Sequence, residues 1–127
     1  MPKTRRTKKS KYKHIIIKNK KYYFYKINWV DITGDSGHAT PDEFEKFMPN
    51  KMLTFAYVFK KNNKYVWTFS SYDTTDVSFS DRNVFPIGCI KKMEKMSIWQ
   101  TKLLWKICQM WNGRRYLLWK GLTRKVL

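Results

Sequence analysis

Few side chains in this sequence of 127 residues have the type and spacing that catalysis needs. Ser36 lies in Gly34-Asp35-Ser36-Gly37, a tetrapeptide that suits a serine nucleophile, and His38 follows it directly. A nucleophilic serine needs a positioned base and an acid that orients the base. His14 lies in a basic segment where nothing is predicted to orient it. We therefore interpret residues 34–37 as a turn in which Asp35 and Ser36 bond to local backbone, and we expect no enzymatic activity.

Potential metal ligands are also poorly spaced. Zinc takes three or four Cys, His or carboxylate ligands, and the sequence has no C-x-x-C pair. The scattered candidates are His14, His38, Cys89 and Cys108. The acids at 73, 76 and 81 lack the pattern of a calcium loop. The sequence therefore predicts no metal and no cofactor, and both cysteines are expected to be small buried hydrophobic residues in a reducing compartment.

Charge offers a different chemistry. The chain has 27 Lys and Arg against 9 Asp and Glu, a formal net charge of +18. Residues 1–22 hold ten of the basic residues and residues 97–127 hold seven, with no acid in either segment, whereas residues 23–96 hold the other ten and all nine acids. Such an excess predicts a polyanionic partner, with nucleic acid favoured over an acidic membrane surface.

The basic ends supply the candidate phosphate contacts. In the N-terminal arm these are Lys3, Arg5, Arg6, Lys8 and Lys9, and at the other end they are Arg114, Arg115, Arg124 and Lys125. Binding of this kind has little sequence specificity and weakens steeply with salt, because released counterions drive it. DNA and RNA, and single and double strands, remain open alternatives.

The elements that must position these residues are mainly strands. Residues 22–31 are aromatic and β-branched, which predicts a strand with Ile27 and Trp29 on one face and Tyr22, Phe24 and Lys26 on the other. If that second face is open, its two aromatic rings and Lys26 form a platform on which bases could stack. The alternative is that both faces are covered.

Further elements follow along the chain. Thr40, Pro41 and Glu43 predict a short capped helix. Residues 51–59 and 64–71 predict a hairpin with an Asn-containing turn, residues 72–82 a loop, and residues 83–95 two short extended pieces, the second of which closes the sheet.

The C-terminal region changes to a helical period. Ser97 and Gln100 predict a capping box, and Asn112-Gly113 predicts the end of a helix over residues 98–111. Its apolar stripe includes Trp99, Leu103, Ile107 and Trp111. We expect this amphipathic helix to dock on a viral or host protein, on a second copy of the chain, or on its own barrel.

Several stretches resemble a group of small uncharacterised tailed-phage proteins. These stretches are Lys26–Asp31, Gly34–Gly37, Thr68–Asp73 and Asp81–Ile90, in the last of which a proline-led turn joins two late strands. The resemblance covers about residues 22–96 and implies a viral setting and a small five-stranded SH3-like or Sm-like β-barrel, without any chemistry.

Together these features predict a mainly β protein in three parts. Residues 1–21 are expected to form a basic, disordered arm, residues 22–96 a small barrel with one inserted helix, and residues 97–127 a basic, Trp-rich helix and tail. The predicted function is non-enzymatic nucleic-acid binding. The alternatives are an oligomerising module of a viral assembly and a barrel that captures a small anionic nucleotide. No secretory signal or apolar run of about 18 residues occurs, so an intracellular location in a host cytoplasm is expected.

Overall fold

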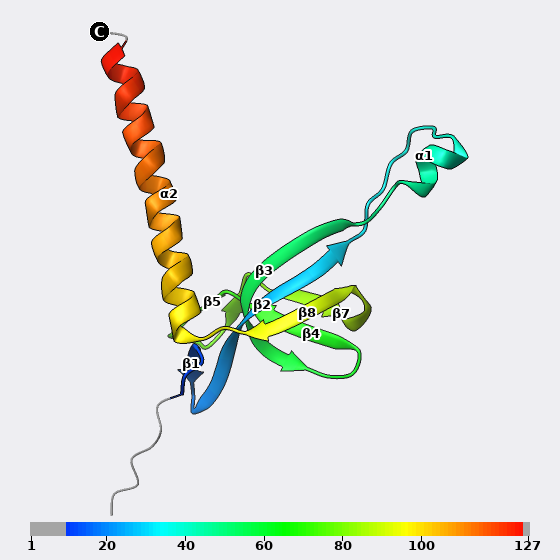
Figure 1. Ribbon diagram of the computed structural model, residues 1–127. Helices are drawn as coiled ribbons and strands as arrows, with labels where there is room; N and C mark the ends of the chain where they lie inside the picture. The colour runs from blue at the N-terminus through cyan, green and yellow to red at the C-terminus, as the bar shows by residue number, and fades with distance from the viewer. Residues whose placement is uncertain (1–9, 126–127) are drawn as a thin grey trace, which may run out of the picture. The chain divides into compact units, whose positions relative to one another are not determined.

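A computed structural model of the chain describes the backbone of residues 10–125 and the side chains of residues 10–111 (Figure 1). Its helices and strands are β1 (His14–Ile17), β2 (Lys20–Asp31), α1 (Pro41–Glu45), β3 (Asn50–Lys61), β4 (Tyr65–Phe69), β5 (Ser71–Tyr72), β6 (Phe79–Ser80), β7 (Asn83–Pro86), the 3-10 turn η1 (Ile87–Cys89), β8 (Ile90–Lys95) and α2 (Ile98–Lys125). The chain divides into a sheet unit, His14–Met96, and a helix unit that contains α2 and residues 10–13.

The sheet unit is built on one antiparallel sheet of six strands, rather than the five that the sequence predicts. The order is β1-β2-β3-β4-β7, and β8 also pairs with β2. Strand β2 is long enough to hold both neighbours, because β1 pairs with its first residues, Lys20–Tyr23, and β8 pairs with Tyr25–Trp29. Strands β5 and β6 form a separate two-stranded ribbon.

Residues 14–21, assigned above to the arm, belong instead to the sheet. The isoleucines of β1 are β-branched and favour a strand, and Ile17 is buried. Lys18 and Asn19 connect β1 to β2 with φ angles of 45° and 63°. Two consecutive positive φ angles are typical of the tight hairpin turn that matches strand twist. The basic arm therefore ends before His14.

The predicted hairpin is confirmed as β3 and β4. The side-chain Oδ1 of Asn62 accepts hydrogen bonds from the backbone N–H of Lys64 at 2.8 Å and of Tyr65 at 2.7 Å. This Asn thus fixes the turn and sets the register of the two strands.

Two apolar clusters hold the sheet unit together. The first is centred on Ile27, Val66 and Phe85, which are 0%, 0% and 4% exposed. The second, of Ile17, Tyr22 and Phe69, draws on β1, β2 and β4. Because Tyr22 and Ile27 lie at positions of opposite parity on β2, the two clusters lie on opposite faces of that strand.

The β2–β3 hairpin carries α1 at its far end (Figure 1). The predicted capping box is confirmed, since the Thr40 hydroxyl accepts from the Glu43 N–H and the Glu43 carboxylate accepts from the Thr40 N–H. Every residue from 34 to 53 is exposed. We call residues 31–48 the hairpin tip.

The helix unit begins with a second confirmed capping box. The Ser97 hydroxyl accepts from the Gln100 N–H, and the Gln100 amide oxygen accepts from the Ser97 N–H. The helix does not stop at Asn112-Gly113 but continues to Lys125, because an Asn-Gly pair lowers helix propensity without blocking a helical hydrogen bond. It is also less strictly amphipathic than predicted, since Trp105 falls on the side away from the apolar stripe and is exposed.

The cysteines differ from expectation in burial. Both are free thiols, but Cys89 is only half-buried and Cys108 is exposed on α2. Within the described part of the chain, no helix is both long and apolar enough to cross a membrane.

Candidate nucleic-acid interface

A groove of about 950 Å³ opens on the sheet unit between the β3–β4 hairpin, the β5–β6 ribbon and β7. We call it the aromatic groove, since its lining includes Phe59, Trp67, Phe69 and Phe79. Phe69 forms a buried floor, and its ring centroid lies 4.7 Å from that of Phe79. Phe59 contacts Phe79 edge to face at 5.1 Å and remains 38% exposed. The groove therefore presents aromatic surface to solvent on a rigid base.

A β-bulge shapes one wall of this groove. Tyr57 and Val58 pair with Phe69 and Thr68, but the register then shifts so that Lys60, rather than Phe59, pairs with Trp67. A bulge re-aims side chains. In an unshifted register Phe59 would lie opposite Trp67, on the same face as Phe69. The shift places Lys60 opposite Trp67 instead, with its Nζ 5.6 Å from the centroid of the Trp67 ring, and Phe59 still lines the groove.

A second lysine lies against the same aromatic surface. The Lys20 Nζ lies 5.5 Å from the Phe59 ring centroid and 5.4 Å from that of Tyr22. Cations over ring faces are held by the ring quadrupole and keep their charge available at the surface. Lys20 and Lys60 thus bring two positive charges to the exposed ring of Phe59 and the half-buried ring of Trp67.

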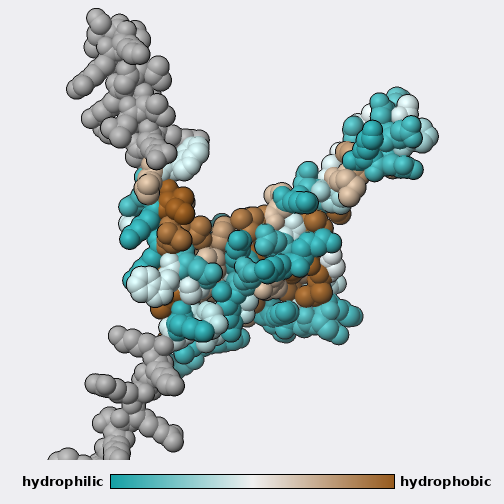
Figure 2. Space-filling view, in the orientation of Figure 1, coloured by the Kyte–Doolittle hydropathy of each residue, from teal (hydrophilic) through white to brown (hydrophobic). Residues whose placement is uncertain are grey.

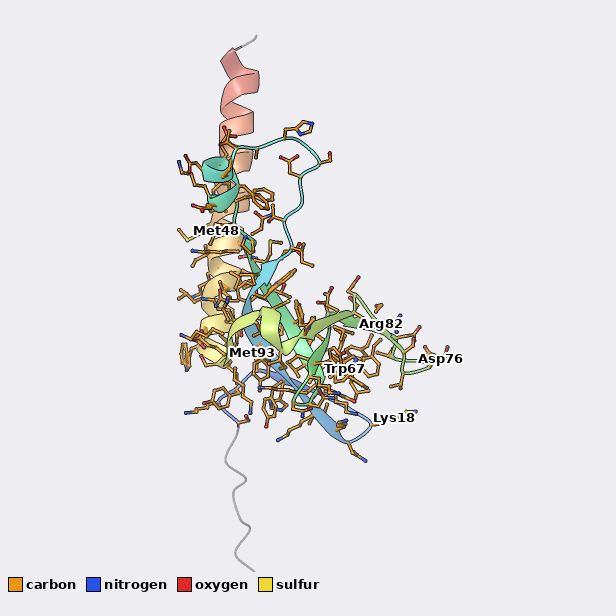
Figure 3. All side chains as sticks on the ribbon, turned by 90° about the vertical axis from the view of Figure 1, so that its right-hand side faces the viewer. Lys18, Met48, Trp67, Asp76, Arg82 and Met93 are labelled. Atoms are coloured by element: carbon orange, nitrogen blue, oxygen red, sulfur yellow. The ribbon has the colours of Figure 1, made fainter. Side chains whose placement is uncertain are left out.

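Arg82 supplies the charge of the opposite wall. It is exposed and lines the groove, and Figure 3 shows it on the same side of the sheet unit as Trp67. The neighbouring Asp81 does not pair with it in the described chain, where Lys92–Glu94 is the ion pair found. Asp81 instead accepts a hydrogen bond of 2.7 Å from the Ser71 hydroxyl. The guanidinium therefore keeps its planar fork for a phosphate.

Local hydrogen bonds fix the β5–β6 ribbon. The Asp73 Oδ1 accepts from the Thr75 N–H at 2.7 Å, and the Asp73 N–H donates to the Ser78 carbonyl at 2.7 Å. The bonds from the Thr75 and Asp76 N–H groups lower the pKa of Asp73. Val77 has a φ of 53°, which is unusual for a β-branched residue, and it packs against the Ile17–Tyr22–Phe69 cluster. The groove wall is thus held in a strained but packed conformation.

Five of the nine acids lie at the end of β2 or in the segment that links it to β3, whereas Asp81 lines the groove and Asp73 and Asp76 lie between the two strands of the ribbon. Residues 31–45 hold five of the nine acids and no Lys or Arg. The rest of the sheet unit, residues 14–30 and 46–96, has 13 Lys and Arg against 4 acids. The body that bears the groove is therefore itself strongly basic, although the whole of residues 23–96 is close to neutral.

The predicted stacking platform is only partly available. Tyr22 is 6% exposed and packs edge to face on Phe69, so its ring cannot receive a base in this conformation. Phe24 is half-buried, with its ring centroid 5.0 Å from that of Tyr57. Lys26 is half-buried and pairs in register with Glu94 of β8, whose pKa is lowered mainly by Lys92 and in small part by Lys26. Tyr22 is covered by Ile17 of β1 and Phe79 of the ribbon, whereas Phe24 packs against Tyr57 of β3.

The predicted phosphate ligands of the two ends stay predictions. Lys3, Arg5, Arg6, Lys8 and Lys9 lie outside the described residues. Arg114, Arg115, Arg124 and Lys125 belong to the backbone of α2, and their side chains lie outside the described part of the chain. The predicted interaction residues of the helix, Trp99, Leu103, Ile107 and Trp111, are all exposed.

The sequence alone did not predict that Phe59, Trp67 and Phe79 line one groove. The sequence favours Arg82 as a residue that pairs with a nearby carboxylate and pins its loop, with a phosphate contact as the alternative, but no ion pair of Arg82 is found in the described chain. The ribbon that forms one wall of the groove leaves no pattern in the sequence. The alternation of side chains along a strand places Trp67 and Phe69 on one face of β4.

The remaining sequence candidates are structural. The Asp35 Oδ1 accepts from the Gly37 N–H at 2.8 Å, which confirms the predicted turn for Asp35. His14 lies on β1 beside Tyr23, about eight strand residues and so roughly 26 Å from the end of β2 at Asp31. The turn that holds Ser36 follows that end. Among the described residues, no three His, Cys, Asp or Glu side chains gather as metal ligands would.

Comparison with known proteins does not assign this chain to a family. No protein-family model matches the chain, and no curated protein or solved structure does.

Proposed function

We propose that this chain is a phage-type small barrel protein that binds single-stranded nucleic acid without enzymatic activity. The observation that carries the proposal is the aromatic groove, in which the exposed ring of Phe59 and the half-buried ring of Trp67 lie near Lys20 and Lys60, and which Arg82 also lines. Single-strand binders combine such stacking surfaces with a positive track for the backbone. The two basic ends add phosphate contacts that are independent of sequence.

The strand topology supports an SH3-like barrel. Strands β2, β3, β4 and β7 are neighbours in chain order, and a one-turn 3-10 helix leads from β7 into β8, which returns to pair with β2. A sheet whose last strand returns to its first long strand needs only curvature to close. The Pro86-led turn, β8 and the resemblance over residues 22–96 support the phage-type interpretation.

The experiment is a titration of nucleic-acid-free full-length protein into labelled single-stranded and duplex oligonucleotides, of DNA and RNA, over a salt series. We expect tighter binding to the single strands and an affinity that falls linearly with salt on logarithmic axes. A mononucleotide should compete weakly, because it occupies one stacking position. Equal affinity for duplex and single strand, or a salt slope of zero, would refute the mechanism.

A matched pair of charge variants locates the site. Arg82→Gln and Lys91→Gln each remove one positive charge from an exposed position, but only Arg82 lines the groove. We expect Arg82→Gln to weaken single-strand binding several-fold more than Lys91→Gln. Equal effects would mean that total charge, rather than the groove, attracts the strand.

An interaction module of a viral assembly is the second candidate. The observation that favours it is the exposed apolar surface of α2, where Trp99 is 81% and Leu103 is 60% exposed. Apolar surface of this extent on a soluble protein commonly marks a contact with another chain.

A further inference from the structure

The hairpin tip has an apolar surface that its own fold does not use. Ile32, Phe44 and Met48 are 90%, 69% and 68% exposed, and α1 has no buried residue. Figure 2 shows hydrophobic residues at the surface of this projection among hydrophilic ones. The capping box stabilises α1 locally, so the tip presents these side chains without packing them.

We propose that the hairpin tip of one copy binds the first turns of α2 of a second copy, in a head-to-tail contact. This inference is independent of nucleic-acid binding and gives the second candidate function a defined interface. It rests on a hollow in the tip, on opposite charges and on an exposed tryptophan.

The tip contains a hollow of about 650 Å³. Pro41, Phe44 and Phe47 contribute apolar lining, and Asp35 and Glu43 contribute carboxylates. This volume accommodates one large aromatic side chain, and the carboxylates can receive a cation beside it. An aromatic anchor in such a pocket is the usual centre of a protein interface.

The helix offers the complementary group. Trp99 is 81% exposed, and the Lys102 Nζ lies 5.7 Å from the centroid of its ring. Lys106 lies one turn further along the same side of the helix. An exposed indole flanked by lysines matches an apolar hollow rimmed by carboxylates.

The charges of the two surfaces favour α2, rather than the hairpin tip of another copy, as the partner of this hollow. The hairpin tip, residues 31–48, carries five acids and one lysine, whereas residues 97–127 carry seven Lys and Arg and no acid. Two tips would repel each other, and so would two helices, but a tip and a helix attract. Because the contact joins different surfaces, repeated association produces a ring or a filament rather than a symmetric dimer.

Sedimentation velocity of the nucleic-acid-free full chain over a concentration series tests this contact. We expect the average mass to rise with concentration and to fall when salt is added. The double variant Phe44→Ala/Phe47→Ala and the variant Trp99→Ala should each weaken association by about 30-fold, the loss typical of a hot spot. Trp105→Ala, which removes an exposed tryptophan from the other side of α2, is the matched control and should associate like the wild type.

Mixing the two deficient variants is the decisive step. The tip variant keeps an intact helix and the helix variant keeps an intact tip, so an equimolar mixture should form a 1:1 heterodimer and nothing larger. A monomer at every concentration would overturn the proposal. So would association that is abolished by Trp99→Ala but kept in the tip variant, because that result indicates a helix–helix contact. Single-strand affinity through Arg82 should be unchanged in both monomeric variants, which separates failure here from failure of the proposed function.

Discussion

Arg82 and Asp81 are adjacent in sequence but have different roles in the groove. The Asp81 carboxylate is engaged by the Ser71 hydroxyl, which ties β5 to the start of β7. Arg82 lines the groove together with Phe59, Trp67 and Phe79. A fixed carboxylate next to an available cation confines any phosphate to the Arg82 side. The placement of single side chains thus determines the path along which a nucleic-acid backbone could run.

Asp73 gives a prediction about pH. Backbone hydrogen bonds lower its pKa in the folded protein, so its stabilising contribution is complete above the unfolded pKa of about 3.9 and is lost as pH falls through the lower folded value. We expect the Thr75 amide to exchange faster below that pH, as measured by NMR. In Asp73→Asn this acid-induced change should disappear, and if it persists another group is responsible.

At the scale of elements, the composition and alternation of apolar residues predict most of the strands. The β2 pattern, the Asn62 turn and both capping boxes could be derived because each rests on local chemistry. Strand β1 was missed because its lysine-rich flanks gave residues 14–21 the composition of a tail. The end of α2 was misplaced because Asn-Gly disfavours a helix only weakly when good helix formers flank it.

The groove could not be predicted from pattern alone. Tyr22 and Phe24 look like open aromatic positions because nothing local shows that Ile17 and Phe79 pack on Tyr22 or that Tyr57 packs on Phe24. Lys60 comes to lie opposite Trp67 through a register shift, which depends on tertiary packing.

A matched pair of isoleucines tests the position of the core. Ile27 is 0% exposed at the centre of the main cluster, whereas Ile32 in the hairpin tip is 90% exposed. Ile27→Ala should lower the free energy of unfolding by about 2–5 kcal/mol, because it leaves a cavity. Ile32→Ala should change it by less than about 0.5 kcal/mol. Chemical denaturation measures both, and similar losses would contradict the assigned burial.

At the scale of the whole molecule, the strand topology explains why most acids of the sheet unit lie at the hairpin tip and most of its basic residues lie elsewhere. The long β2–β3 hairpin collects the acids of residues 31–45 at its tip, which leaves the rest of the sheet unit basic. A nucleic-acid surface and an acidic docking surface can therefore exist in one chain without opposing each other.

The basic arm gives a prediction about salt. Deleting residues 2–9 removes five Lys and Arg and leaves β1 intact. We expect single-strand affinity to fall and the salt slope to become shallower by about 0.7 for each phosphate that the shortened protein no longer neutralises. A fluorescence titration at several salt concentrations measures this slope. An unchanged slope would show that the arm does not bind phosphates.

The most direct test of the central claim is single-strand binding by two variants of Trp67. Trp67→Phe keeps an aromatic ring in the groove, and Trp67→Ala removes it, while far-UV circular dichroism verifies the fold of each. If bases stack in the groove, we expect near-normal affinity for Trp67→Phe and a loss of about 5- to 100-fold for Trp67→Ala, corresponding to one stacked base. Wild-type affinity in a folded Trp67→Ala protein would contradict the account and assign nucleic-acid binding to the basic ends alone.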